Sequence, residues 1–380
     1  MRRLVSLDVL RGITVAAMIV VNNPGNWLAI SPWLRHADWN GCTPADLVFP
    51  FFIVIMGVAL ALSLDRGRRG EPSAMPEGGR GTDATRRLVG PHRQLFVRTL
   101  VLIALGLVLN AVAAWPDLSA IRIPGVLQRI AITYAIAGLI VLHLRPRWQL
   151  AIGVLLLAGQ WVAIAALAGG HPAAAAPVNT GWIDGAIFGS HLLTTTGDPE
   201  GVLGIMASVA TALGGVMAGR WFQRESRPGR RLRYLVAGGG AAALAGLIWA
   251  AWWPMNKALW TGSFALFSIG LAILALAMCD ALVDVSGGGR RWTRPFEWLG
   301  TNALAVYIAS EAVRSVMDYP LIHRGASWLS VKEWLFWRWL APFVNDRGGS
   351  RSSLIFALVV ALGWTLVAGR LYRSRVFIRI

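Results

Sequence analysis

The sequence predicts an all-α membrane protein, a polytopic transmembrane bundle of about ten spanning helices with both termini in the cytoplasm. Hydrophobic residues make up 56% of its 380 positions and charged residues only 14%, whereas soluble domains are about 45–50% apolar. The mean hydropathy is +0.55. Apolar stretches of about 17–25 residues, long enough to cross a hydrocarbon core, recur along the chain. We therefore expect a single integral-membrane domain over residues 1–380.

The expected spanning segments follow one another closely. The first begins with basic residues, but Asp8 and Arg11 interrupt its apolar run and no cleavage site of small residues follows. We therefore expect a retained helix rather than a signal peptide. The segments lie near residues 9–28, 46–64, 95–114, 124–143, 148–168, 201–222, 233–253, 260–282, 297–317 and 353–370.

The aromatic segment 328–343 differs from these spans because Lys332, Glu333 and Arg338 interrupt it. We expect it to lie as an amphipathic segment on the outer membrane surface. If it spans instead, the helix count rises to about eleven.

Lysine and arginine set the orientation, because positively charged short loops stay in the cytoplasm. They gather at alternating ends of the segments, which places both termini and the basic stretch 65–93 on the cytoplasmic side. That stretch is rich in glycine, proline and arginine and is expected to be a mobile loop. The net charge of +17 follows from this topology, so we expect no nucleic-acid partner.

Membrane lipids are the expected partners of the bundle. Tryptophans at both ends of outer loops are typical of the belt at the headgroup level. The sequence leaves the oligomeric state open, and a homodimer is one alternative. The tryptophans near the outer face are Trp27, Trp33, Trp39, Trp115, Trp252, Trp253 and Trp260.

A polar cluster at the start of the second segment is the main candidate site. It contains His36, Asp38, Asn40 and Asp46, and Asn22 ends the first segment. Titratable groups are costly to place against hydrocarbon, so they mark a functional site by default. Histidine moves protons near neutral pH, and an asparagine amide can hold a carbonyl oxygen. The alternative is that Asp46 merely caps the second helix.

Other polar residues at helix ends are candidates for binding substrates. Glu311 lies within the ninth segment and has either a functional role or an interhelical hydrogen bond. Asp8 and Arg11 lie three apart on one helix face, where they either pair with each other or contact a cofactor. The histidines show no metal-ligand spacing, so we expect no metal. The remaining candidates are Gln128, Arg129, Glu200, Asn256, Lys257 and Asn302.

Several of these blocks together resemble the heparan-α-glucosaminide N-acetyltransferase family. The first block is specific, and the later ones agree with the family in order, so the resemblance covers nearly the whole chain. The blocks are LDVLRG at 7–12, HADWNG at 36–41, DLVFP at 46–50, IPGVLQR at 123–129, DPEGVLG at 198–204, NKALW at 256–260 and GTN at 300–302.

The resemblance implies transfer of an acetyl group from cytoplasmic acetyl-CoA to the amine of a terminal glucosamine across the membrane. The catalytic histidine of the family matches His36, and an asparagine beside it matches Asn22. The chain lacks the amino-terminal luminal region of the animal enzyme and has Pro24 in a turn that is glycine-rich there. We therefore expect a bacterial-type relative in the cytoplasmic (inner) membrane, acting on free glucosamine or a short amino sugar, with His36 facing outward.

The expected mechanism has His36 as general base, oriented by Asp38 or Asp46, while Asn22 or Asn40 holds the thioester oxygen. We expect direct transfer, and an acetyl-histidine intermediate is the alternative. One rival function is an acyltransferase that modifies hydroxyl groups of a surface polysaccharide or lipid. Another is an amino-sugar or ion transporter, which the missing repeat symmetry disfavours.

Overall fold

The computed structural model confirms a helical polytopic membrane protein. It describes residues 4–68, 90–167, 180–194, 197–287, 291–324, 327–344, 346 and 348–378. Most of the expected loop 65–93 lies outside these residues, although α2 (Pro44–Arg68) extends into it. The chain divides into two compact units. Unit 1 comprises Met1–Phe52, Val108–Ile121 and Ala275–Ile380, and unit 2 comprises Ile53–Leu107 and Arg122–Leu274.

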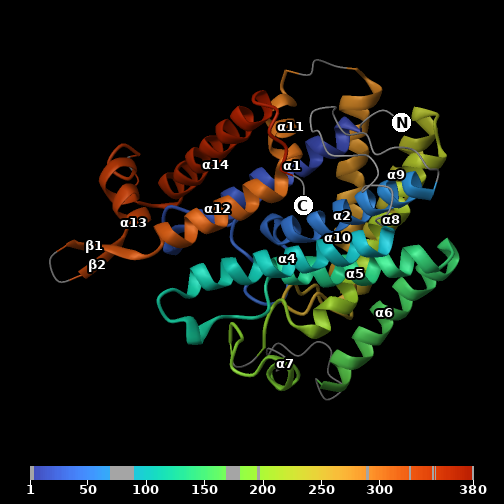
Figure 1. Cartoon of the computed structure of the whole chain (residues 1–380), viewed down its shortest axis with the longest axis horizontal. Helices are drawn as coiled ribbons and strands as arrows, with labels where there is room; N and C mark the ends of the chain where they lie inside the picture. Colours follow the sequence, from blue (N-terminus) through green and yellow to red (C-terminus); the bar gives the residue numbers. More distant parts are fainter. Residues whose placement is uncertain are drawn as a thin grey trace. The chain divides into compact units, whose positions relative to one another are not determined.

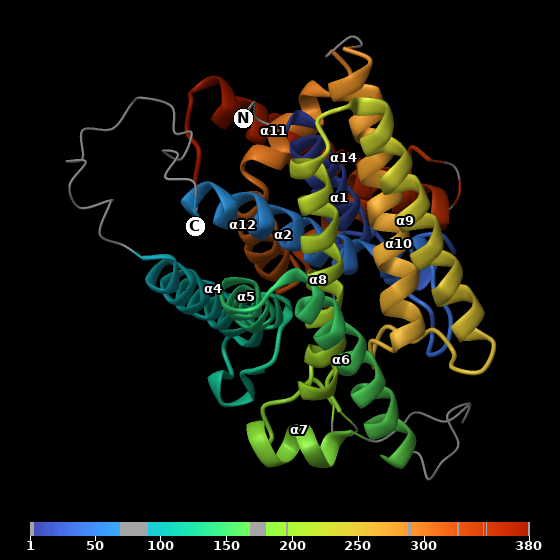
Figure 2. The same ribbon diagram turned by 90° about the vertical axis from the view of Figure 1, so that its right-hand side faces the viewer.

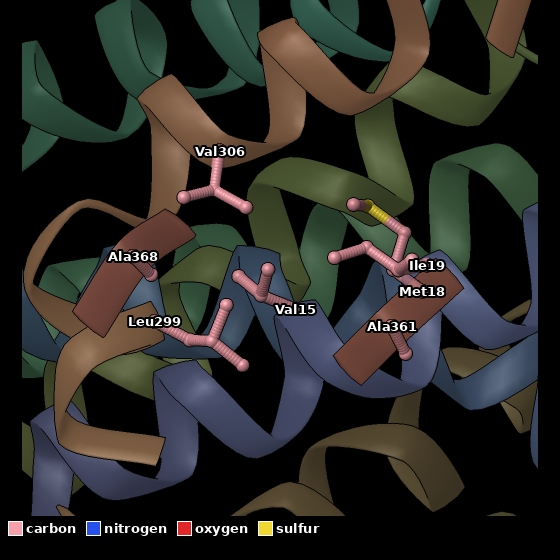
Figure 3. Close-up of a cluster of buried hydrophobic side chains, with 7 residues drawn as sticks. All are labelled: Val15, Met18, Ile19, Leu299, Val306, Ala361 and Ala368. Atoms are coloured by element: carbon pink, nitrogen blue, oxygen red, sulfur yellow. The ribbon is translucent and has the colours of Figure 1, made fainter. Parts of the chain in front are cut away.

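Unit 1 is built around α1 (Val5–Asn22), which α11 (Arg294–Thr301), α12 (Ala303–Met317) and α14 (Ser350–Arg373) contact (Figure 1). The buried face of α1 presents Val15, Met18 and Ile19 to these three helices. Figure 3 shows these side chains converging with Leu299, Val306, Ala361 and Ala368. The apolar spacing along α1 therefore specifies the core of the unit.

The closest approach in unit 1 is the crossing of α1 and α11. A Cβ on Gly12 would lie 1.8 Å from the backbone oxygen of Phe296, and one on Gly300 would lie 1.8 Å from that of Asp8. Only glycine permits this approach, as in other small-residue crossings between membrane helices. The glycines of two motif blocks thus form one helix contact.

The expected ninth span, 297–317, is wrong as a continuous helix, because the structure breaks it at Asn302 into α11 and α12. The Asn302 amide donates to the carbonyl oxygen of Val376 at 3.1 Å, and its own oxygen accepts from the N–H of Ile378 at 2.9 Å. An asparagine that bonds to backbone elsewhere competes with helix formation. Asn302 therefore ends one helix and begins the next while holding the C-terminal tail.

Segment 328–343 contains no long helix. Strands β1 (Pro320–Arg324) and β2 (Ser327–Ser330) form an antiparallel hairpin, followed by α13 (Val331–Leu335) and the π-helix η4 (Phe336–Leu340). Trp328, Trp337 and Trp339 are exposed, whereas Phe336 is fully buried against Phe356 of α14. Exposed tryptophans on a short segment suit the expected position at the membrane surface, which stays a prediction.

The remaining elements of unit 1 are short or shared between the units. The 3₁₀ turns η1 (Trp27–Ala29) and η2 (Leu118–Ala120) lie in loops. The π-helix η3 (Asp280–Val285) continues α10 (Gly262–Cys279), and its Asp284 accepts from the N–H of Ser6 at 3.1 Å. That bond ties the start of α1 to η3.

Unit 2 is organised around α8 (Val202–Arg224), a largely buried helix with a long run of small residues. Helices α5 (Val126–His143), α6 (Pro146–Leu167) and α9 (Pro228–Ala250) contact it (Figure 2). The unit also includes most of α4 (Pro91–Ala114), the short α7 (Gly181–Phe188) and most of α10. Small side chains on α8 let the neighbouring backbones approach closely.

Nine helices within the described residues are long and apolar enough to cross a membrane, one fewer than the ten expected segments. The missing segment is the broken pair α11 and α12. In unit 1 the N–H of Gly25, just after α1, donates to Ser353 near the start of α14, so these helices run antiparallel. The start of α1 and the end of α14 therefore lie at the same end of unit 1.

Candidate active site

The start of α2 holds His36 against a buried carboxylate. His36 Nδ1 lies 2.8 Å from Asp46 Oδ1, and Asp46 is only 1% exposed. The second oxygen, Asp46 Oδ2, accepts from the N–H of Ala37 at 3.1 Å and from both the N–H and the hydroxyl of Thr43 at 3.0 Å. Gly41 has φ +126°, a conformation that favours glycine in the turn leading to this cap.

These contacts fix what the imidazole can do. Asp46 is acceptor-only when ionised, so the proton between the two side chains belongs on His36 Nδ1 and leaves Nε2 as the basic nitrogen. The His36 side chain is 47% exposed, which allows a substrate to reach it. Asp46 therefore both caps α2 and orients His36, so the two alternatives for this residue coexist.

The other two members of the cluster lie further out. Asp38 is 85% exposed and pairs with Arg35 at 3.2 Å. Asn40 is also exposed on the same loop. Asp38 and Asp46 were both expected to orient His36. In the structure Asp46 is hydrogen-bonded to His36, whereas Asp38 forms an ion pair with Arg35.

In unit 1, Asn22 begins a chain of polar contacts that leads to Lys332. Its amide donates to Glu311 Oε1 at 2.7 Å, and Arg314 donates to Glu311 Oε2 at 3.0 Å. Arg314 also reaches Asp318 at 3.2 Å, and Lys332 pairs with Asp318 at 2.7 Å. Glu311 was expected to have either a functional role or a hydrogen bond between helices. The bond to Asn22 joins α12 to α1 and orients the amide of a candidate catalytic residue, so the two roles are compatible.

Asp8 and Arg11 lie at the opposite end of α1 from Asn22. Arg11 donates to Asp8 at 3.1 Å and to the Gly300 carbonyl oxygen at 3.4 Å. Because Gly300 belongs to the α1–α11 crossing, the pair supports that contact. This favours a structural role for both residues beside the expected cofactor role.

Glu200 lies in unit 2 in an ion cluster with Arg122 and Asp198. Arg122 donates to both carboxylates, with 2.8 Å between Nε and Asp198 Oδ2. Burial alone would raise the pKa of Asp198, but the hydrogen bond and charge of Arg122 hold that pKa below its ordinary value. Burial opposes the charge on Arg122 as well, and the two acids raise its pKa above the usual range.

Gln128 and Arg129 occupy the first turn of α5. Arg129 is 2% exposed and donates to Ser208 and to the carbonyl oxygens of Pro199 and Gly204. Its guanidinium also lies 4.2 Å from the ring centroid of Trp260. These bonds join α5 to α8, so the geometry gives Arg129 a structural role beside the expected substrate role.

Asn256 and Lys257 lie in the turn before α10. Asn256 Oδ1 accepts from the N–H of Leu259 at 2.9 Å, and the Lys257 carbonyl oxygen accepts from the N–H of Trp260. Asn256 is buried. Trp253 and Trp260, expected in the lipid belt, are buried inside unit 2, and Trp260 donates to Thr211 at 3.2 Å. Those two assignments were wrong because the turn folds inward.

Sequence reasoning missed three residues that organise these sites. Arg122 and Lys332 looked like scattered loop charges, and Asp184 carried no motif. Asp184 is buried and accepts from the N–H groups of Asp198 and Val202, which fixes the DPEG loop at the start of α8. Asp184 lies in the first turn of the short helix α7, and an acidic residue at a helix start was the available signal.

The fold and the His36–Asp46 pair define a polytopic helical membrane protein with a histidine hydrogen-bonded to a buried carboxylate at the start of a helix. A family model described as heparan-alpha-glucosaminide N-acetyltransferase, catalytic, matches residues 3–198. The chain belongs to this family.

The human protein named heparan-alpha-glucosaminide N-acetyltransferase is 27% identical over 451 aligned positions, and its mouse counterpart is 24% identical over 448. Each alignment covers 100% of this chain and 60% of the relative. The chain thus spans about three fifths of the length of these relatives.

Proposed function

We propose that this protein is a transmembrane N-acetyltransferase that moves the acetyl group of acetyl-CoA to the amine of glucosamine or of a glucosamine-terminated saccharide. The observation that carries the proposal is the His36–Asp46 pair, in which a buried carboxylate holds Nδ1 of a half-exposed imidazole. Family membership supports the reaction class. The names of the two relatives support the acceptor.

The chemistry follows from what an amine needs in order to attack. Only a neutral amine is nucleophilic, so His36 Nε2 takes a proton from the amine as its nitrogen bonds to the thioester carbonyl carbon. The C–S bond then breaks, and the CoA thiolate accepts a proton from the imidazolium. Asp46 stabilises that imidazolium and keeps the ring in place, as the carboxylate does in a catalytic triad.

Asn22 is the proposed donor to the thioester oxygen. One N–H of its amide is held by Glu311 at 2.7 Å, and an amide nitrogen carries two hydrogens. The Glu311 contact therefore sets the direction of the second N–H, which would bond to the oxygen as negative charge develops. Glu311 is thus proposed as a positioning residue.

The proposed arrangement in the membrane keeps the polyanionic donor on the cytoplasmic side, where the positive loops are expected. His36 would face the outer side of a bacterial cytoplasmic membrane. In unit 1, Asp8 and Asn22 are separated by fourteen helical residues, or about 21 Å at the rise of an α-helix. An extended pantetheine arm is of this order of length, so a donor bound at one end could present its thioester at the other.

The test is consumption of acetyl-CoA thioester by purified protein with and without glucosamine. We expect acceptor-dependent consumption, and His36→Ala should lower turnover by about 10²–10⁴-fold. Mass spectrometry of wild-type protein given donor alone separates direct transfer from an acetyl-histidine intermediate.

Each alternative result has its own meaning. Consumption only with a polysaccharide or lipid hydroxyl would indicate an O-acyltransferase. Glucosamine uptake without any thioester consumption would indicate a transporter. A His36→Ala protein within about threefold of wild type would remove the histidine from the mechanism.

A further inference from the structure

A cavity of about 410 Å³ lies between α11 and α14 in unit 1. It is lined by Arg294, Glu297 and Trp298 of α11 and by Tyr372 and Arg373 of α14. Its volume falls in the range of about 300–1,000 Å³ that holds small molecules. Two guanidinium groups, two aromatic rings and one carboxylate make its lining unusual for the end of a membrane helix.

Two of the lining side chains, Trp298 and Arg373, contact each other across the cavity's two helices. The Arg373 guanidinium lies 5.4 Å from the ring centroid, within the range of a cation–π contact. Glu297 accepts from the Thr293 hydroxyl at 2.7 Å. Arginine both stacks on aromatic faces and binds phosphate with a fork of N–H donors.

The cavity lies at the end of unit 1 where α1 begins and α14 ends. Its α11 wall is the helix whose Gly300 contacts Asp8 and accepts from Arg11. This end carries the chain termini and is expected to face the cytoplasm.

We propose that this cavity binds the phosphorylated adenosine portion of the acetyl donor, a claim that rests on the function proposed above. The ring of an adenine would stack on Trp298 or Tyr372, and its phosphates would pair with Arg294 and Arg373. Glu297 would accept from a ribose hydroxyl or from the exocyclic amine. The acetyl thioester itself makes no contact here.

The experiment compares two donors that differ only in the nucleotide, acetyl-CoA and S-acetylpantetheine. The double variant Arg294→Gln with Arg373→Gln should raise KM for acetyl-CoA by about tenfold or more. It should leave kcat/KM for S-acetylpantetheine unchanged. Both arginines are exposed at helix ends, so the folded core should survive.

Arg370→Gln is the matched control, because Arg370 is an exposed arginine in the same last turn of α14 and does not line the cavity. It should behave as wild type with both donors. Equal losses with both donors, or no loss with acetyl-CoA, would overturn the proposal.

A direct binding measurement tests the nucleotide site independently of whether the protein transfers acetyl groups. CoA and adenosine 3′,5′-bisphosphate are titrated into wild type, the double variant and the control by calorimetry in nanodiscs. If no thioester is consumed by wild type, weaker binding of both probes to the double variant still supports the nucleotide site. Equal binding in all three proteins, or none in wild type, would overturn it.

Discussion

At the scale of single residues, the two carboxylates near His36 have opposite surroundings. Asp46 is buried with its second oxygen satisfied by three donors, whereas Asp38 is exposed beside Arg35. A buried, fully bonded carboxylate can hold an imidazole in one orientation, while an exposed one competes with water. The environment of each acid therefore decides which one serves the histidine.

The first prediction compares Asp46→Asn with Asp38→Asn. Asp46→Asn should lower kcat by about 10²-fold or more, because the amide no longer favours the proton on His36 Nδ1. Asp38→Asn should stay within about threefold of wild type, since an exposed ion pair contributes little. Rates of acetyl transfer at equal amounts of folded protein check this. Similar effects of both substitutions would contradict the assignment of Asp46.

The second prediction concerns Glu311 and the Asn22 amide. Glu311→Ala should lower kcat roughly 10–100-fold with the KM for acetyl-CoA unchanged, because Asn22 loses its fixed direction. Glu311→Gln should restore part of the rate, since a glutamine oxygen still accepts from Asn22. A purely structural role predicts instead that both variants melt earlier but keep normal kcat.

The third prediction is a pH dependence at Asp198. Its pKa in the folded protein lies below the value in the unfolded chain, so the ionised form stabilises the fold. That contribution is present above about pH 4 and is lost as the pH falls through the folded pKa. The melting temperature of Asp198→Asn should therefore trail wild type at pH 7, with a gap that closes below pH 4. A gap independent of pH would argue against the Arg122 ion cluster.

At the scale of elements, the α1–α11 crossing and the break at Asn302 together position α12 against α1. The crossing brings the two backbones together at glycines, and the break lets α12 set out in a new direction toward Asn22. A continuous helix over 297–317 could not make both contacts. The polar residue that interrupts the span therefore places Glu311.

The fourth prediction tests this crossing with Gly300→Ala. The added Cβ would meet the Asp8 carbonyl oxygen, so α1 and α11 must separate at a cost of about 1–3 kcal/mol. Gly363→Ala is the control, because nothing lies within 4 Å of its Cβ and alanine favours a helix. Thermal unfolding in detergent should show a loss for the first and none for the second. Tolerance of Gly300→Ala would mean that the crossing is looser than described.

At the scale of the whole molecule, the orientation of the chain can be tested through its own cysteines. Cys42 lies half-exposed on the His36 loop, and Cys279 is buried. The positive-inside rule predicts that Cys42 faces the outside and that Ser286, after η3, faces the inside. The fifth prediction is therefore that a cysteine at position 42 and a cysteine at position 286 are labelled from opposite sides of the membrane.

A membrane-impermeant maleimide should label Cys42 in right-side-out vesicles. In the variant with Cys42→Ser and Ser286→Cys, labelling should appear only after permeabilisation. Labelling of both positions from one side would mean that the number of crossings between them is even. The broken pair α11–α12 lies outside this interval, so a matching probe on the C-terminal tail after α14 reports on its crossing.

The sequence by itself determined the helical membrane class, nine of the ten expected segments and the candidates near His36. These features are local: apolar length fixes a span, and His36 and Asp46 are ten residues apart within one loop and helix start. The gathering of lysine and arginine at alternating ends of the segments likewise needs no tertiary contact.

Tertiary structure decided which carboxylate holds His36, what Glu311 does and where the ninth span breaks. Asn22 and Glu311 are 289 residues apart, and Asn302 bonds a tail 74 residues away. The burial of Trp253 and Trp260 by the inward turn is also a result of tertiary packing. Such pairs depend on how helix faces pack, because hydrogen bonds between distant segments form only after the core has set their positions, and no local pattern in the sequence encodes them.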